Sequence, residues 1–428
     1  MLLGTLGGAC RTQPSPPPES AAAVTGAQSD TDLKDFRLRA LEARVQMMPE
    51  GSERDYFSGM LAVRSGHFDE GIRRLNRTLP RFRESDPKRA AMALEAVAIA
   101  YRANNRYGDA AGAYAELAER FAGHLDRFPA DDAALARILS GTPPQTITWQ
   151  GPVRLKTSTN PLGLPVADLT VNGVRGPWLL DTGANQSVVT QTFAKRLGLK
   201  PLPGVASVGS GLTGLKTSVQ VAVLPAMQLG GASLKNIVIM ILADASLRIG
   251  SGPDAYQINA ILGYPIFRAL AAVTFTPGEF LAGDAAEKNI RGTRMYMRGL
   301  TPAIECDVEG QPLLFTFDTG ASSTDLSVRY YELFRHEAES WKKHTVESGG
   351  AGGSIQQDVY LQPVVVLRVG PATVRLKDVS VLPVRTNAGL DVLFGNLGQD
   401  FVAGFERFSL DFSTMTFSLG APMKAEAK

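Results

Sequence analysis

Two copies of the tetrapeptide Asp-Thr-Gly-Ala, beginning at Asp181 and Asp318, lie 137 residues apart in this chain. If the chain folds so that the two carboxyls lie close together, they cannot both be ionised, because like charges at short range disfavour the charged state. The ionised carboxyl can then take a proton from a water molecule while the protonated one donates to a carbonyl. Such a pair titrates as a unit, so the sequence assigns no separate roles to the two residues. This chemistry is hydrolysis without a covalent intermediate.

The residues after each aspartate suit a tight loop. A glycine two positions on lets another backbone or side chain approach closely. A single Asp-Thr-Gly is more often an ordinary turn in which Asp caps its own backbone, and the duplication is what argues against that interpretation here. The predicted loop residues are Thr182, Gly183 and Ala184 in the first copy and Thr319, Gly320 and Ala321 in the second.

The similarity between the two copies extends well beyond the tetrapeptides. After Pro143-Pro144, short runs of Val, Thr, Leu and Phe bounded by turn residues predict many short strands. Each copy has a strand hairpin before its aspartate, an apolar pair followed by glycine after it, and a closing aromatic strand. These segments are residues 167–173, 260–263 and 273–275 in the first copy and 303–310, 392–395 and 410–412 in the second. The pattern predicts that the same fold occurs twice in the chain.

Together these motifs resemble the pepsin/retropepsin superfamily of aspartic peptidases, over about residues 151–420. The resemblance implies a mostly β, pseudo-dimeric fold with a single active site formed by Asp181 and Asp318. It also implies that the hydroxyls of Thr182 and Thr319 cross-brace the two loops, and that Gly263 and Gly395 belong to the ψ-shaped strands behind them. We therefore expect an intramolecular pseudo-dimer in a monomeric chain, with units at residues 151–285 and 290–420.

Each unit of such an enzyme needs a hairpin flap that closes over the substrate and excludes water. Glycine-rich stretches follow both aspartates at a similar interval, and both precede a β-rich run. The predicted flap residues are Gly209, Ser210 and Gly211 in the first unit and Gly350, Ala351 and Gly352 in the second. Neither stretch has the aromatic tip found in pepsins, so substrate specificity stays open.

Residues 31–142 have a helical period and form a separate predicted domain. Residues 56–72 and 94–110 look alike at an offset of 39 residues: each has a helix, a short polar turn, an aromatic, an acid and a second helix. This resembles tetratricopeptide repeats. Two interpretations stay open: a docking surface for a protein partner, or a scaffold that only packs on the rest of the chain.

Composition excludes several classes of function. The chain has 428 residues, with 44 Lys+Arg against 42 Asp+Glu, so it offers no excess positive charge for a nucleic acid. Its two cysteines, Cys10 and Cys306, cannot build a disulfide framework, and its four histidines are scattered. We expect no metal and no organic cofactor. No apolar run reaches the ~18 residues needed to cross a bilayer.

The first 30 residues predict a flexible leader. Small residues before Cys10 and a Pro/Ser-rich stretch after it resemble the end of a bacterial lipoprotein signal. The missing basic segment and the short apolar stretch count against this. The compartment is therefore predicted as the cell envelope or periplasm, with a lipid on Cys10 as the means of attachment to a membrane, and otherwise as the cytoplasm.

The sequence thus predicts an aspartic endopeptidase that binds an extended polypeptide as an added strand. Ala184 and Ala321 stand where many acid peptidases place a hydroxyl, which implies a less acidic pH optimum than that of gastric pepsins. The alternative is a catalytically silent peptide-binding or adaptor protein with the same fold.

Overall fold

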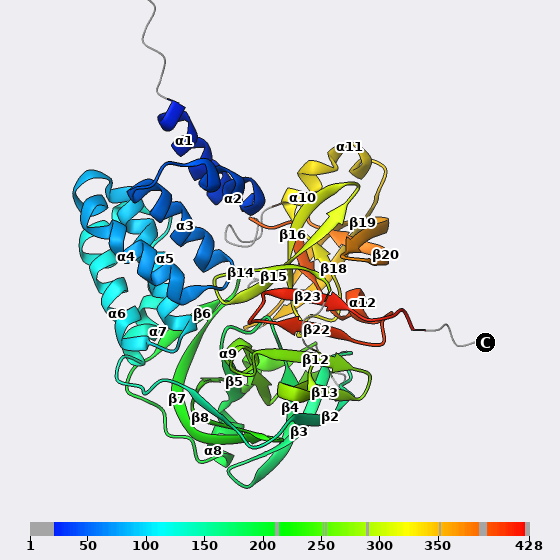
Figure 1. Cartoon of the computed structure of the whole chain (residues 1–428). Helices are drawn as coiled ribbons and strands as arrows, with labels where there is room; N and C mark the ends of the chain where they lie inside the picture. The colour runs from blue at the N-terminus through cyan, green and yellow to red at the C-terminus, as the bar shows by residue number, and fades with distance from the viewer. Residues whose placement is uncertain are drawn as a thin grey trace, which may run out of the picture.

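The computed structural model describes residues 21–209, 214–250, 252, 255–287, 291–350, 352–384 and 392–423. A helical region comes first, followed by two β-rich units; in Figure 1 the helices stand beside the green first unit and the yellow-to-red second unit. The expected order of an all-α part and a mostly β part is therefore confirmed. No helix among the described residues combines the length and apolarity needed to cross a bilayer.

The helical region begins earlier than expected. Helix α1 starts at Ala21, inside the predicted flexible leader, because its alanine-rich start favours helix and its later residues Ser29, Asp32 and Leu33 are buried. The remaining elements of this region are α2 (Leu38–Met47), α3 (Ser52–Arg64), α4 (Phe68–Ser85), α5 (Pro87–Ala103), α6 (Tyr107–Glu116), η1 (Leu117–Phe121), η2 (Ala122–His124) and α7 (Ala130–Ile138), with α1 ending at Lys34.

Helices α3 and α4 form one hairpin and α5 and α6 another, where the two similar sequence segments predict them. Each second helix begins with a buried aromatic, Phe68 or Tyr107. The first hairpin packs closely, since a Cβ at Gly59 would lie 2.7 Å from Leu75 Cγ. The assignment of these hairpins to the tetratricopeptide type stays a prediction.

The strands of the two units follow the same order. The first unit, with the short strand β1 before it, contains β1 (Thr146–Trp149), β2 (Val153–Thr159), β3 (Pro165–Val171), β4 (Val174–Leu180), β5 (Ser187–Thr190), α8 (Gln191–Arg196), β6 (Ala206–Gly209), β7 (Lys216–Leu229), β8 (Ala232–Leu242), η3 (Asp244–Leu247), β9 (Arg248–Ile249), β10 (Tyr256–Gln257), β11 (Ala260–Leu262), α9 (Tyr264–Ala269), β12 (Ala272–Thr276), β13 (Glu279–Ala282) and η5 (Gly283–Ala285). The second unit contains β14 (Thr293–Arg298), β15 (Thr301–Val308), β16 (Gln311–Phe317), β17 (Asp325–Leu326), α10 (Val328–Leu333), α11 (Arg335–Ala338), β18 (Lys342–Gly350), β19 (Gly353–Val369), β20 (Ala372–Val381), β21 (Gly395–Leu397), α12 (Gln399–Val402), β22 (Phe408–Asp411) and β23 (Thr416–Leu419).

One antiparallel sheet joins the units, in the order β2-β13-β12-β22-β23-β14. Its centre is the pairing of β12 with β22, which are the two predicted aromatic strands. There Thr274 pairs with Ser409, and their hydroxyl oxygens lie 2.9 Å apart in the buried core. Each unit contributes three strands, so the sheet relates the two units by an approximate twofold axis between β12 and β22.

The helical region packs against both units. Phe36 and Leu38 share a hydrophobic cluster with Leu314 and Leu393 of the second unit. At the other end, Tyr107, Leu135 and Leu139 share a cluster with the first unit, including Ala206 and Val219. The helices are therefore part of the same folded body as the units that carry Asp181 and Asp318.

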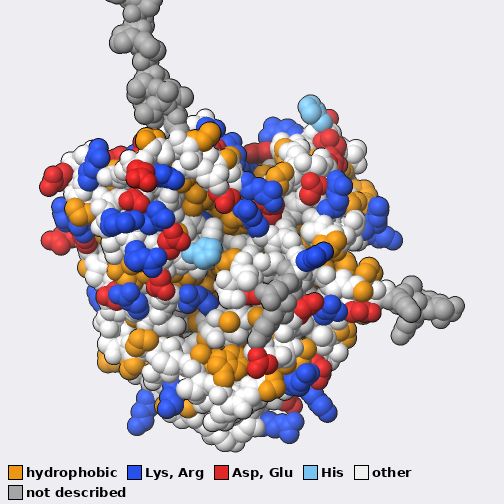
Figure 2. All heavy atoms as spheres, viewed as in Figure 1, with side chains coloured by type: hydrophobic (Ala, Val, Ile, Leu, Met, Phe, Trp, Pro, Cys, Tyr) orange, Lys and Arg blue, Asp and Glu red, His pale blue; other side chains and the backbone are white. Residues whose placement is uncertain are grey.

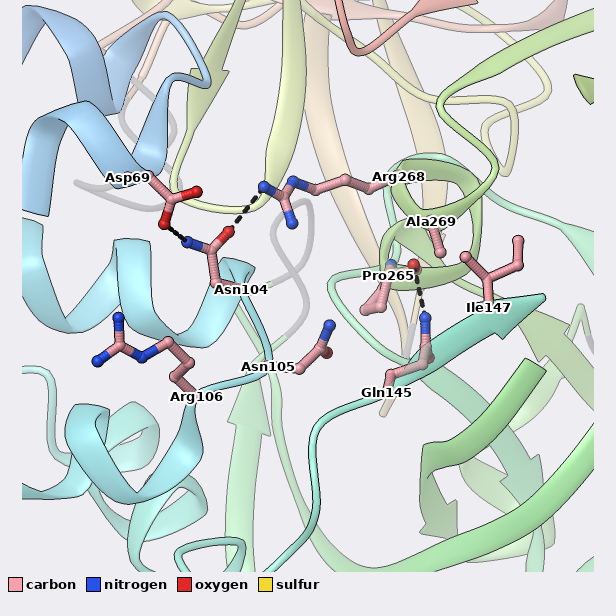
Figure 3. Close-up of a pocket in the computed structure, with 9 residues that line it drawn as sticks. All are labelled: Asp69, Asn104, Asn105, Arg106, Gln145, Ile147, Pro265, Arg268 and Ala269. Carbon is pink, nitrogen blue, oxygen red and sulfur yellow. Dashed lines mark hydrogen bonds between the residues drawn. The ribbon is translucent and has the colours of Figure 1, made fainter.

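Arg268 of α9 ties the helical region to the first unit. Its guanidinium donates to the Ala103 carbonyl at 2.6 Å and to Asn104 Oδ1 at 2.7 Å, and it lies 4.9 Å from the centre of the Phe68 ring. Figure 3 shows Arg268 pointing across the junction to Asn104, which in turn donates to Asp69. The carbonyl of Ala103, at the end of α5, is thereby satisfied by a charged donor.

We predict that Arg268→Ala lowers the free energy of unfolding by about 1–3 kcal/mol, because two charge-assisted hydrogen bonds and a cation–π contact are lost. Chemical denaturation of the full chain measures this. Arg175→Ala is the matched control: Arg175 pairs with Asp168 on the surface with 75% and 54% of the two side chains exposed, and removing it should cost no more than about 0.5 kcal/mol. Equal losses in the two variants would contradict the assignment of Arg268 as a structural tie.

Candidate active site

Each aspartate stands directly after a buried strand that has a parallel neighbour. Strand β4 pairs with β11 and strand β16 pairs with β21. The backbone N–H of Asp181 donates to Leu262 O, and that of Asp318 donates to Leu397 O, both at 3.0 Å. The same strand pairing thus presents both carboxyls, one from each unit.

The threonines of the two loops hydrogen-bond across the boundary between the units. The N–H of Thr182 donates to Thr319 Oγ1 at 2.9 Å, and the N–H of Thr319 donates to Thr182 Oγ1 at 3.1 Å. Each hydroxyl also donates to a carbonyl of the opposite unit: Thr182 to Phe317 at 3.2 Å and Thr319 to Leu180 at 2.6 Å. Both threonines are fully buried, so these bonds fix the separation of the loops in a dry environment.

The glycines of the two loops allow each carboxyl to touch the opposite loop. A Cβ at Gly183 would lie 2.3 Å from Asp318 Cγ, and a Cβ at Gly320 would lie 2.4 Å from Asp181 Cγ. Any side chain at either position would displace the opposite carboxyl. The glycines are needed here for close approach, because neither lies in the left-handed region of backbone conformation.

The two carboxyls lie close to each other, each against the glycine of the opposite loop, and burial raises the pKa of both. Asp181 Oδ1 accepts the N–H groups of Gly183 at 2.9 Å and Ala184 at 2.8 Å, and Asp318 Oδ1 accepts that of Gly320 at 2.7 Å. After burial, the charge of Asp318 further raises the pKa of Asp181. The pair can therefore hold one proton between two oxygens that face the same space.

Asn396 breaks the symmetry of the pair, and the sequence analysis did not identify it. Its Oδ1 accepts the Thr316 hydroxyl at 2.6 Å, which leaves its NH₂ group to donate, and its side chain hydrogen-bonds to Asp318 and lowers the pKa of that carboxyl. The matching residue of the first unit is Ile261, which cannot donate. The arrangement favours the proton on Asp181 and the charge on Asp318.

The same strand register corrects one predicted residue. Leu180 pairs with Leu262, and Phe317 pairs with Leu397, so the second-unit counterpart of Gly263 is Gly398 and not Gly395. The N–H of Gly263 donates to Ser187 Oγ, and that of Gly398 donates to Thr324 Oγ1, at 3.1 and 3.2 Å. The apolar pair Leu393-Phe394 misled the sequence comparison because the true counterpart contains the polar Asn396.

Both predicted flaps are hairpins. Strands β6 and β7 form the first and β18 and β19 the second; Gly209 and Gly350 end the outgoing strands, while Ser210, Gly211 and Ala351 lie outside the described residues. The second hairpin reaches the first unit, where Gly352 N–H donates to Ser246 O at 3.0 Å. Helix α7 packs against β6, so the helical region supports the first hairpin.

Asp325 is a third carboxyl near the pair. It is the cross-strand neighbour of Asn396, which contacts Asp318. Burial, together with the nearby charge of Asp400, raises the pKa of Asp325 to about 7. Among the described residues, neither an ion pair nor a hydrogen bond of its carboxyl is present. The matching position in the first unit is Val188.

We predict that Asp325→Asn becomes more stable than the wild type as the pH rises. The folded pKa lies above the unfolded value, so the folded wild type binds the proton more tightly and loses stability between about pH 4 and pH 7. The variant lacks this loss, and its advantage at pH 7.5 over pH 4 should be roughly 1–4 kcal/mol. Denaturant titrations at the two pH values measure it, with Asp168→Asn, an exposed carboxyl, as the control; a pH-independent difference would contradict the assignment.

No group of His, Cys, Asp or Glu side chains that could hold a metal ion occurs in the described part of the chain. The site consists of carboxyls, hydroxyls and backbone amides.

The sequence model of a family described as aspartyl protease matches residues 167–266. This stretch of the chain resembles an aspartyl protease. The match includes Asp181 and Gly263 of the first unit and supports a protease-like fold; it does not reach Asp318. No curated protein matches the sequence significantly.

Solved structures with detectable similarity include two seed proteins. The basic 7S globulin from soybean is 10% identical, with a TM-score of 0.40, and the match covers 63% of this chain and 94% of that chain. Conglutin gamma, a basic 7S globulin from lupine seeds, is 14% identical, with a TM-score of 0.41 and coverages of 66% and 97%.

Proposed function

We propose that this protein is an aspartic endopeptidase with one active site, formed by Asp181 and Asp318. The observation that carries the proposal is the pair of carboxyls that two interlocked loops bring together: the loop threonines exchange hydrogen bonds, each carboxyl lies against the glycine of the opposite loop, and each loop donates backbone N–H groups to its own aspartate. A turn with a structural role would not need two half-buried carboxyls side by side, because their mutual repulsion and partial burial cost free energy.

In this mechanism one proton is shared by the pair. The ionised carboxylate, favoured on Asp318, takes a proton from water as the water oxygen bonds to the carbonyl carbon of the peptide. The protonated Asp181 gives its proton to the carbonyl oxygen. Collapse of the gem-diol intermediate breaks the C–N bond as the proton that Asp318 took from water passes to the leaving nitrogen. One hydroxyl of the gem-diol returns its proton to Asp181, which restores the singly protonated pair.

The substrate in this proposal is an extended polypeptide held between the pair and the two flap hairpins, with no metal or organic cofactor. The hairpin edges can add a strand, which gives affinity through backbone hydrogen bonds.

Packing of the helices on both units supports a scaffold role for them; a protein partner on their outer surface stays a prediction. Lysine, arginine and acidic side chains are interspersed on the face in Figure 2. Attachment through a lipid on Cys10, and an envelope location, also stay predictions, and Cys10 lies outside the described residues.

Asp318→Asn should abolish all cleavage of a denatured protein mixture that the wild-type chain produces between pH 3 and 8, because no carboxylate can then share the proton with Asp181. Mass-spectrometric mapping of the products measures this.

Gly320→Ala should lower kcat/KM at least about 100-fold, since its methyl group displaces the Asp181 carboxyl. Gly112→Ala is the matched control, because no heavy atom lies within 4 Å of a Cβ there. Unchanged cuts in Asp318→Asn would exclude this active site, and absence of cuts by the wild type would favour the silent binding protein.

The pH dependence should follow the raised pKa values of the pair. We expect maximal activity above about pH 4, because burial raises the pKa of the carboxyl that must be ionised. Asn396→Leu removes the amide that lowers the pKa of Asp318, so the acidic limb of the kcat/KM profile should move to higher pH. A uniform loss of rate with an unmoved limb would show that Asn396 acts only on structure.

A further inference from the structure

The side-chain layers beside the two carboxyls differ in chemistry between the units. In each unit, four cross-strand neighbours lie on one face of the sheet. In the second unit this face carries the residue that contacts the aspartate, and in the first unit it carries the residue at the matching position. In the first unit these are Leu179, Ile261, Val188 and Met240. In the second unit the same register positions hold Thr316, Asn396, Asp325 and Ser380. An apolar layer in one unit is thus replaced, residue by residue, by a polar layer in the other.

The opposite face of the same strands shows no such difference. There the first unit has Leu180, Leu262 and Val189, and the second has Phe317, Leu397 and Leu326, all buried in the main core. The fold therefore does not itself require polar residues in the second unit, since the first unit builds the same strands with an apolar layer. The substitution is confined to the face that carries Asn396, next to the carboxyl pair.

Within the polar layer, only part of the hydrogen-bonding capacity is used among the described residues. Thr316 donates to Asn396, and Asn396 contacts Asp318, so these two residues support the pair. The neighbouring Asp400 accepts the N–H and the hydroxyl of Thr324 at 3.0 and 2.7 Å. Asp325 has neither kind of partner, yet protein surrounds it and part of its surface stays accessible.

The charges around Asp325 are of one sign. The charge of Asp400 raises the pKa of Asp325, and that of Asp318 raises the pKa of Asp181, in both cases after burial. A group of partly accessible carboxyls attracts a positively charged group and disfavours an acidic one. An unpartnered carboxyl at such a depth costs free energy that a bound donor would offset.

Resting on the proposed peptidase function, we propose that the second unit forms a specificity pocket in which Asp325 binds a lysine or arginine side chain of the substrate. The basic side chain reaches Asp325 past Asn396, and Ser380, the next neighbour along the layer, can accept a second hydrogen bond. The binding of the cation leaves Asp325 ionised, with its proton released to solvent.

Two pairs of statine-type peptides test the pocket without requiring cleavage; within a pair the peptides are identical except for one side chain next to the statine. One carries lysine and the other norleucine, and each is made with that residue on either side of the statine. Calorimetric titration of the full chain at pH 7.5 should show the lysine peptide binding about 10- to 100-fold more tightly on one side only. Asp325→Asn should reduce this ratio to about one, and Asp168→Asn, which removes an exposed carboxyl of the first unit, should leave it unchanged.

Mass-spectrometric mapping of the wild-type cuts gives the second measurement, with basic residues expected at one fixed position beside the cleaved bond. Cuts without that preference, or equal binding of the two statine peptides, would overturn the pocket while leaving the peptidase intact. Lysine-selective binding that depends on Asp325, without any cuts, would support the pocket and reject the peptidase. A lysine preference that survives in Asp325→Asn would overturn the role of Asp325.

Discussion

The contact between the carboxyls of Asp181 and Asp318 is the constraint on which the rest of this structure depends. Two half-buried carboxyls repel one another when charged, so the protein must hold them together against both desolvation and repulsion. It does so with rigid surroundings: two buried threonines that exchange hydrogen bonds between the loops, and two glycines whose missing side chains make room for the opposite carboxyl. The free energy that keeps the pair together comes from the packing behind it.

That packing is continuous from one unit to the other. The sheet that joins β12 to β22 fixes the relative position of the units, and it lies behind the loops as a common support. The helical region then bridges the periphery: α1 and α2 lie near the second unit, and α6 and α7 lie near the first (Figure 1). The two flaps have different support, because α7 of the helical region packs against the first hairpin, while Tyr331 of α10 stacks on Tyr360 of the second.

The duplication makes the two units similar in fold, and the positions at which they differ change the chemistry around the carboxyl pair. A fully symmetric pair would share its proton equally, whereas Asn396 opposite Ile261 favours a charge on one side. Asp325 opposite Val188 extends the same asymmetry away from the pair. Both departures lie on one face of the second unit, while the core face stays apolar in both units. Selection for stability alone would favour apolar residues on both faces.

The sequence by itself determined the features that depend on local pattern. The two tetrapeptides, the glycines after the aspartates, the hairpins and the change from helical to strand period are all readable along the chain, because each needs particular residue types within a short segment. The split between an all-α and a mostly β part follows from the same patterns. The start of α1 was missed because helix propensity in the leader was weaker evidence than its Pro- and Ser-rich beginning.

Only the tertiary structure decided the features that depend on register between distant strands. Gly398 rather than Gly395 matches Gly263 because β21 pairs with β16 at Leu397, a register that the misleading apolar pair at Leu393-Phe394 hid. Asn396 reaches Asp318, and Asp325 lies beside Asn396, through pairings of residues far apart in sequence. A one-residue slip in such a pairing turns every side chain to the opposite face, so no count along the chain could place these groups beside the carboxyls.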